Sequence, residues 1–207
     1  MSAFFSDPKL KILSMVTPTG NNALQAVGVA AAIKPQPSNP IVLCGIGDGT
    51  SQQGEVLEAI GEAVRDRLPV LFMIQDNRWA ISTTTRGRTI FSLPDGEADS
   101  YCGVPIRRVD GRDAANALQR FGTVVQEIRS SRKPQIVLLE VERLHSHTNA
   151  DDHRVYRTTE DLRQAAESGD PITRLEHHLL ELGCEQETLK QIRVEVEHQV
   201  AEAEAAA

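Results

Sequence analysis

The sequence predicts an α/β fold with a mainly parallel sheet, flanking helices and a helical C-terminal extension. Short continuous apolar runs alternate along the chain with longer segments whose apolar residues recur at helical spacing. Two of these apolar runs end in polar loops rich in glycine or asparagine, and beyond Thr158 only helical spacing remains. We expect one globular domain, with an α/β cofactor-binding part over 1–157 and a helical extension of the same domain over 158–207.

The first helix is expected to be capped by Asn22 and to end at a group of prolines. Its apolar positions are Leu24, Val27, Ala30 and Ala31. The run that follows, 41–44, is typical of a parallel strand covered on both faces. A second helix over 56–68 ends at Pro69, and another apolar strand spans 70–74, which completes one βαβ unit.

A polar, irregular stretch over 82–100 precedes a second cycle of strand, helix and strand, predicted at 106–109, 113–128 and 136–141. In the C-terminal extension, Pro171 suits the first turn of a helix and Gly183 suits a helix end. The alanine-rich tail after Val200 is expected to be frayed.

Composition excludes several classes of function. A formal net charge of −7 without a basic cluster argues against a nucleic-acid partner. No apolar stretch approaches the roughly 20 residues that span a bilayer, so we expect no membrane partner and a cytoplasmic location. Cys44, Cys102 and Cys184 are far apart and read as reduced thiols.

The loop after the first strand carries the strongest chemical signal. It reads Gly47, Asp48, Gly49, Thr50, and it begins where ligands bind in parallel α/β sheets. Backbone amides at Gly49 and Thr50 could donate to phosphate. A carboxylate at Asp48 would repel that phosphate unless a divalent cation lay between them, so the loop predicts magnesium and a diphosphate.

The loop after the next strand supplies the complementary residue. Asn77 lies about one βαβ unit after Asp48, and adjacent parallel strands would bring the two loops together. The amide oxygen of Asn77 and a backbone carbonyl in its loop are suitable ligands for magnesium. Either motif alone would more often be a simple turn, whereas their joint occurrence favours the metal-diphosphate site.

These two loops belong to a longer stretch, GDGTSQQGEVLEAIGEAVRDRLPVLFMIQDNRWAIS, which resembles the thiamine-diphosphate motif of α subunits of branched-chain 2-oxoacid and pyruvate dehydrogenases. The resemblance implies that magnesium is bound by Asp48, Asn77 and the backbone carbonyl of Trp79, where tyrosine is usual. The implied cofactor contacts extend to Gly47, Gly49, Thr50, Ala80 and Ile81. Gln75, where a phosphate-contacting arginine is common, and Asp76 depart from the family pattern.

Two flanking segments extend the resemblance. SMVTPTGNNALQAVGVAAAI implies that Thr17 and Thr19 lie in the loop that touches the aminopyrimidine ring, although both could simply precede a helix. RLHSHTNADDHRVYR implies that His147 approaches the diphosphate and the reacting centre, where an imidazole can move protons. A single hydroxyl at Thr148 gives no ground to predict phosphorylation.

In RLHSHTNADDHRVYR, four residues match the family pattern and are expected to order the loop by hydrogen bonds and charge pairing, or else to be an exposed polar surface: Asp151, Asp152, Tyr156 and Arg157.

The family implies an enzyme that decarboxylates a 2-oxoacid, branched-chain or pyruvate, and passes the acyl unit to a lipoyl-bearing acyltransferase. A β subunit is implied as partner. The sequence also lacks an N-terminal segment usual in α subunits, so either a separate polypeptide is expected to supply it or the chain is a fragment. The alternative is a non-catalytic assembly or relic subunit that keeps the fold, and a transketolase-like enzyme fits the later loop poorly.

Overall fold

The computed structural model describes residues 6–14 and 17–206. At its centre lies a five-stranded sheet in the order β1 (Val42–Gly47), β2 (Val70–Asp76), β9 (Gln135–Glu140), β8 (Val104–Asp110) and β7 (Ser100–Tyr101). The first four strands are parallel, and only β7 runs antiparallel to its neighbour. The predicted mainly parallel α/β fold is therefore confirmed.

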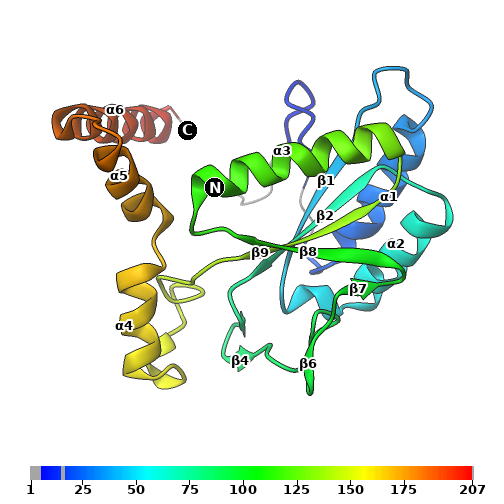
Figure 1. Ribbon diagram of the computed structural model, residues 1–207, viewed down its shortest axis with the longest axis horizontal. Helices are drawn as coiled ribbons and strands as arrows, with labels where there is room; N and C mark the ends of the chain where they lie inside the picture. Colours follow the sequence, from blue (N-terminus) through cyan, green and yellow to red (C-terminus); the bar gives the residue numbers. More distant parts are fainter. Residues whose placement is uncertain (1–5, 15–16, 207) are drawn as a thin grey trace.

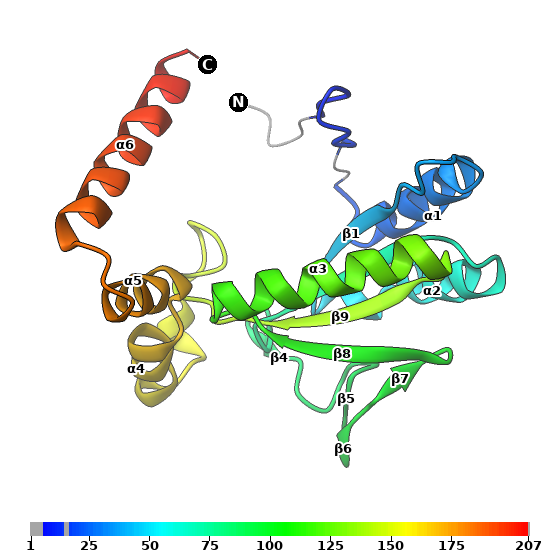
Figure 2. The same cartoon turned by 45° about the horizontal axis from the view of Figure 1, so that its top comes forward.

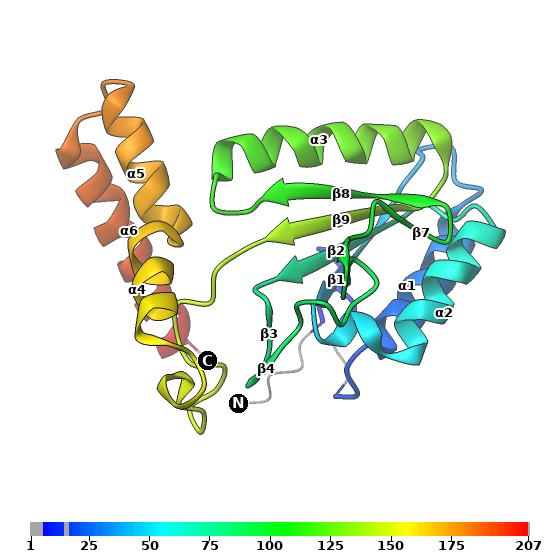
Figure 3. The ribbon, with the colours of Figure 1, turned by 60° about the horizontal axis from the view of Figure 1, so that its bottom comes forward.

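Helices cover both faces of this sheet. The helices α1 (Asn21–Ile33) and α2 (Gly54–Arg65) lie on one face, and α3 (Ala114–Ser131) lies on the other (Figures 1 and 3). Alternate residues of each strand point to opposite faces, so the sheet separates two apolar clusters. Phe72 and Ile74 face α1 and α2, whereas Leu71 and Val137 face α3.

The start of α1 differs from the prediction. Gly20, with φ of 91°, precedes the helix, and Asn22 lies inside it. The side chain of Asn22 instead donates a 2.9 Å hydrogen bond to the carbonyl of Gly45 in β1. The buried face agrees with the predicted one only in part. Val27 and Ala30 are buried as expected, Leu24 and Ala31 are exposed, and Ala23 and Ala26 complete the face that packs on the sheet.

The irregular stretch after β2 contains two short hairpins. The first pairs β3 (Trp79–Ala80) with β4 (Thr83–Thr84), and the second pairs β5 (Ser92–Leu93) with β6 (Gly96–Glu97). The second lies beside β8, where Glu97 pairs with Arg108, whereas the first projects from the end of the sheet at which the parallel strands finish (Figure 3). A 3-10 turn, Thr50–Gln52, separates β1 from α2 in the same region.

The C-terminal helices lie to one side of the sheet (Figure 2). After a 3-10 turn at His153–Val155 come α4 (Thr159–Ser168), α5 (Pro171–Glu181) and α6 (Gln186–Ala205). Pro171 begins α5 and Gly183 follows its end, as predicted. The expected fraying after Val200 is wrong, because α6 continues to Ala205. None of the helices in the described residues is long and apolar enough to cross a membrane.

Candidate functional site

The loops that follow β1 and β2 meet at the end of the sheet. Gly47 pairs with Gln75, and the amide of Asp48 donates to the carbonyl of Gln75 at 3.1 Å. Gly49 lies so close to the second loop that a Cβ added there would be 2.5 Å from the Cβ of Ala80. The predicted proximity of the two loops is confirmed.

Asp48 is a buried carboxylate, with 3% of the residue exposed. One of its oxygens accepts a 2.9 Å hydrogen bond from the amide of Gly49, and the other accepts a 3.0 Å bond from the hydroxyl of Thr85. The Ser51 hydroxyl donates to the backbone carbonyl of Asp48 at 2.6 Å. The Gly49 amide, predicted to donate to phosphate, is thus already bonded within the loop.

A second carboxylate lies beside the first. Burial first, and the nearby Asp48 second, raise the pKa of Asp76 to about 6, against the opposing effect of the amide of Arg78, which donates to its carboxylate at 2.8 Å. The sequence marks Asp76 only as a departure from the family pattern. In the fold, Asp48 and Asp76 form an acidic pair at the ends of β1 and β2.

The loop from Asn77 to Ile81 is held in a strained conformation. Arg78 and Ile81 have φ of 69° and 55°, a region that costs energy for residues with a Cβ and most for a β-branched one. The amide oxygen of Asn77 accepts a 3.0 Å bond from the amide of Trp79. Arg78 also forms an ion pair with Glu142, whose side chain is nearly buried.

The segment after β9 packs against this loop. Arg143 donates to the carbonyl of Ile81 at 2.8 Å and to the hydroxyl of Tyr156 at 2.7 Å. The ring of Tyr156 lies 5.4 Å from that of Trp79, and the guanidinium of Arg157 lies 6.0 Å from the Trp79 ring. Loop 77–81 is therefore clamped from the C-terminal side by Arg143, Tyr156 and Arg157. The sequence predicted that Tyr156 and Arg157 order their own segment, and it gave no role to Arg143.

His147 is exposed at the tip of this segment. Its backbone amide donates to the Asp151 carboxylate at 2.8 Å, and the Tyr156 hydroxyl donates to the same oxygen at 2.7 Å. These bonds, that of Tyr156 first, lower the pKa of Asp151. The expected ordering role of Asp151 agrees with this arrangement, in which His147 is positioned through its backbone.

The residues of the aminopyrimidine segment are less tightly connected. Thr17 and Thr19 are both exposed. The segment is placed by Gly20, where an added Cβ would be 3.0 Å from the Cβ of Gln53, just before α2. Both threonines therefore lie just before Gly20, which packs against Gln53, the residue between the Asp48 loop and α2.

A family profile described as "Dehydrogenase E1 component" matches residues 4–207. The chain belongs to the dehydrogenase E1 component family. Its members in the comparison include the 3-methyl-2-oxobutanoate dehydrogenase subunit alpha of Mycobacterium tuberculosis, which is 31% identical over 177 residues. That alignment covers 86% of this chain and 48% of the relative.

Mitochondrial pyruvate dehydrogenase E1 component subunits alpha are similar too. The Sminthopsis macroura protein is 29% identical over 178 residues, covering 86% of this chain and 48% of the relative. The human somatic form is 29% identical over 177 residues, covering 85% and 45%. This E1 chain therefore spans about half the length of the curated relatives that it matches.

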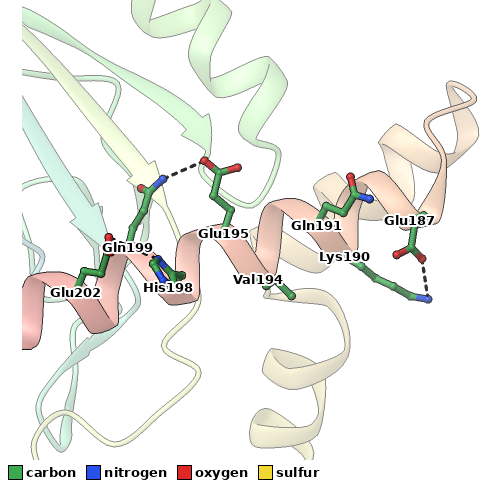
Figure 4. A pocket seen from close by; sticks show the side chains of 8 residues that line it. All are labelled: Glu187, Lys190, Gln191, Val194, Glu195, His198, Gln199 and Glu202. Carbon is green, nitrogen blue, oxygen red and sulfur yellow. Dashed lines mark hydrogen bonds and ion pairs between the residues drawn. The ribbon is translucent and has the colours of Figure 1, made fainter.

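Two further observations concern where a ligand could bind on this E1 chain. A hollow along α6 is lined by residues of that helix, which include Val194 and His198, and by none of the residues at the strand ends (Figure 4). Across the described residues, no three His, Cys, Asp or Glu side chains gather as a metal cluster. The predicted magnesium ligands are one carboxylate, one side-chain amide and one backbone carbonyl, so they would not form a cluster of that kind.

Proposed function

We propose that this chain is the cofactor-binding part of an E1 alpha-type component that binds thiamine diphosphate and magnesium and decarboxylates a 2-oxoacid. The observation that carries the proposal is the buried Asp48 carboxylate in a glycine loop, directly against the loop that bears Asn77. A buried carboxylate is stable only when it is paired, hydrogen-bonded or bound to a metal. The Asp48 carboxylate accepts hydrogen bonds from two neutral donors, the Gly49 amide and the Thr85 hydroxyl, and it forms no ion pair with a cationic side chain among the described residues.

The residues present fit a magnesium ion. Asp48 offers a carboxylate, Asn77 an amide oxygen and Trp79 a backbone carbonyl, all oxygen ligands of the kind that magnesium prefers. Asp76 places a second negative charge beside the first and so increases the local attraction for a divalent cation. The two loops also contain the other proposed contact residues, Gly49, Thr50, Ala80 and Ile81, and Gly47 is the last residue of β1.

When bound, thiamine diphosphate supplies the carbanion chemistry of decarboxylation. The chain's own residues have other tasks in this proposal. Asp48 and Asn77 would hold the ion that neutralises the diphosphate, and Thr17 and Thr19 would contact the aminopyrimidine ring. His147, whose backbone amide donates to the Asp151 carboxylate, would hold or release a proton at its imidazole near the reacting centre.

The proposed substrate is a branched-chain 2-oxoacid or pyruvate, in keeping with the names of the relatives. Those names also describe alpha subunits, which supports a β subunit as partner and a lipoyl-bearing acyltransferase as acceptor of the acyl unit. We further propose a cytoplasmic location.

The decisive test is calorimetry on the complex that co-purifies with the tagged chain from its source cells. We expect magnesium-dependent binding of thiamine diphosphate to the wild type and its loss in Asp48→Ala, because the buried carboxylate of the ion's shell is removed. The exposed Asp95 provides a matched control, and Asp95→Ala should bind as the wild type does. Unchanged affinity in Asp48→Ala would refute the assignment.

A further inference from the structure

The segment that follows β9 carries a glutamate that the fold encloses. Glu142 lies two residues beyond the end of β9, and only 9% of its side chain is exposed. A Cβ added at Gly169, which follows α4, would lie 2.6 Å from the Cβ of Glu142, so the two residues are in close contact. A carboxylate that has lost most of its water needs a cationic or hydrogen-bonding partner in the fold.

Two arginines supply that partner, one from each neighbouring strand end. Arg78 follows β2 and forms an ion pair with Glu142, and Arg112 follows β8 and lies 3.8 Å from the same carboxylate oxygen. Strand β9 lies between β2 and β8, and the last residues of the three strands are paired in register. Because each of the three charged residues lies two positions beyond its strand, their side chains meet at the end of the sheet.

The two arginines differ in their other contacts. The Nε of Arg112 donates to Asp110 at 2.7 Å, and Asp110 lies 3.4 Å from Arg174 of α5. Across residues 6–14 and 17–206, Glu142 is the one partner with which the Arg78 guanidinium forms a hydrogen bond or an ion pair. Loss of the Glu142 charge would therefore release Arg78 but leave Arg112 paired.

The position of Arg78 in its loop gives this contact its importance. Arg78 lies between Asn77 and Trp79, the two proposed metal ligands of loop 77–81, and its φ of 69° is in the left-handed region. Such a conformation costs energy and persists only where surrounding contacts fix it. The amide of Thr85 fixes the backbone of Arg78 by a 3.1 Å bond to its carbonyl, and Glu142 fixes its side chain.

We infer that Glu142 is a positioning residue for the metal site. By holding the Arg78 side chain it keeps the Arg78 backbone left-handed, and that conformation sets the directions of the Asn77 side chain and the Trp79 carbonyl. The inference rests on the proposed function, because it concerns how the proposed ligands are presented. Glu142 acts through Arg78 and is not itself a ligand.

Magnesium binding to the complex that co-purifies with the tagged chain tests the inference. Titration calorimetry at saturating thiamine diphosphate should show a Kd for magnesium at least about tenfold higher in Glu142→Gln, because a neutral amide does not hold Arg78 as an ion pair. Glu140→Gln removes the same charge from the end of β9, at a side chain that is 42% exposed, and should bind as the wild type does. Unchanged affinity in Glu142→Gln, or an equal loss in both variants, would overturn the inference.

A conservative variant separates charge from packing. Glu142→Asp keeps the carboxylate on a shorter side chain, whereas Glu142→Gln keeps the size and loses the charge. We expect Glu142→Asp to lose less magnesium affinity than Glu142→Gln. The reverse order would show that Glu142 only fills space, and would overturn the inference.

A double variant tests whether Glu142 acts through Arg78. Arg78→Met changes a side chain that is 35% exposed and should raise the Kd for magnesium as much as Glu142→Gln does. Adding Glu142→Gln to Arg78→Met should then have no further effect, because the pair is already broken. Losses that add in the double variant would overturn the inference.

Amide exchange gives a readout that needs no ligand. In the complex without magnesium or thiamine diphosphate, we expect residues 77–81 to exchange at least about threefold faster in Glu142→Gln than in the wild type, and residues 43–47 to exchange equally. Equal exchange over 77–81 would overturn the inference. A wild-type complex that binds neither magnesium nor thiamine diphosphate would refute the proposed function, whereas the exchange over 77–81 would still decide whether Glu142 holds the loop.

Discussion

The hydroxyl of Thr85 donates a 3.0 Å hydrogen bond to the carboxylate of Asp48, and both residues are buried. Thr85 follows the β3–β4 hairpin, and its own amide is bonded to the carbonyl of Arg78 at 3.1 Å. This one threonine therefore connects the glycine loop after β1 to the strained loop after β2. The geometry of the candidate metal site depends on a residue outside both motifs.

The bond from Thr85 should be measurable as stability. Thr85→Val keeps the shape of the side chain but leaves the Asp48 oxygen without that donor, at an expected cost of about 1–3 kcal/mol in the free energy of unfolding. Thr85→Ser keeps the hydroxyl and should cost less. Urea denaturation followed by circular dichroism measures both variants, and equal losses would show that the hydroxyl is not responsible.

Asp76 should make stability depend on pH. Its folded-state pKa, about 6, is higher than that of an unfolded aspartate, so between about pH 4 and pH 6 the folded protein binds more protons than the unfolded chain. The free energy of unfolding therefore falls as the pH rises through this window. Asp76→Asn removes the titration and should be more stable than the wild type above pH 6, by about 1–2 kcal/mol, with the difference closing toward pH 4.

This difference is measured by urea denaturation across the pH range in the presence of a chelator, so that no divalent cation neutralises the acidic pair. Asp95→Asn, at an exposed position, controls for the loss of one negative charge. A stability difference for Asp76→Asn that is the same at pH 4 and pH 7 would contradict the assignment.

The contact between the two loops predicts a compensating pair of substitutions. Gly49→Ala would place a Cβ 2.5 Å from that of Ala80, so the loops must separate, at an expected cost of about 1–3 kcal/mol. Ala80→Gly removes the opposing Cβ, and the double variant should recover part of that stability. Thermal unfolding of the single and double variants measures the coupling, and strictly additive effects would exclude a direct contact.

Local sequence patterns were sufficient for the four parallel strands and for the meeting of the Asp48 and Asn77 loops, but not for the short strands between Trp79 and Tyr101. Buried parallel strands are short continuous apolar runs, and neighbouring parallel strands finish at one end of the sheet. The buried face of α1 was predicted only in part, with Val27 and Ala30 right and Leu24 and Ala31 wrong, because alanines carry little periodic signal and because Gly20, rather than Asn22, precedes the helix. The side chain of Asn22 instead donates a hydrogen bond to the carbonyl of Gly45 in β1.

The parts of the site that the sequence did not reveal depend on contacts between distant segments. Thr85 is one of three consecutive threonines, and only the fold shows that it is the buried one that faces Asp48. Arg143 is one of many arginines, and its contacts with Ile81 and Tyr156 exist only once β9 lies beside β2. A pattern local to one segment carries no information about such partners.

The chain has a single tryptophan, Trp79, and its position makes it a probe of the clamp around loop 77–81. Tyr156→Phe keeps the ring against Trp79 but removes the hydroxyl that joins Arg143 to Asp151. We expect faster amide exchange over residues 145–152, because the segment that holds His147 loses those bonds, with little change in Trp79 fluorescence. Tyr156→Ala also removes the ring and should change both signals, as exposing an indole to water shifts its emission to longer wavelength. Fluorescence and hydrogen exchange on the same preparations test this, and an unchanged exchange rate in Tyr156→Phe would show that the hydroxyl does not hold the His147 segment.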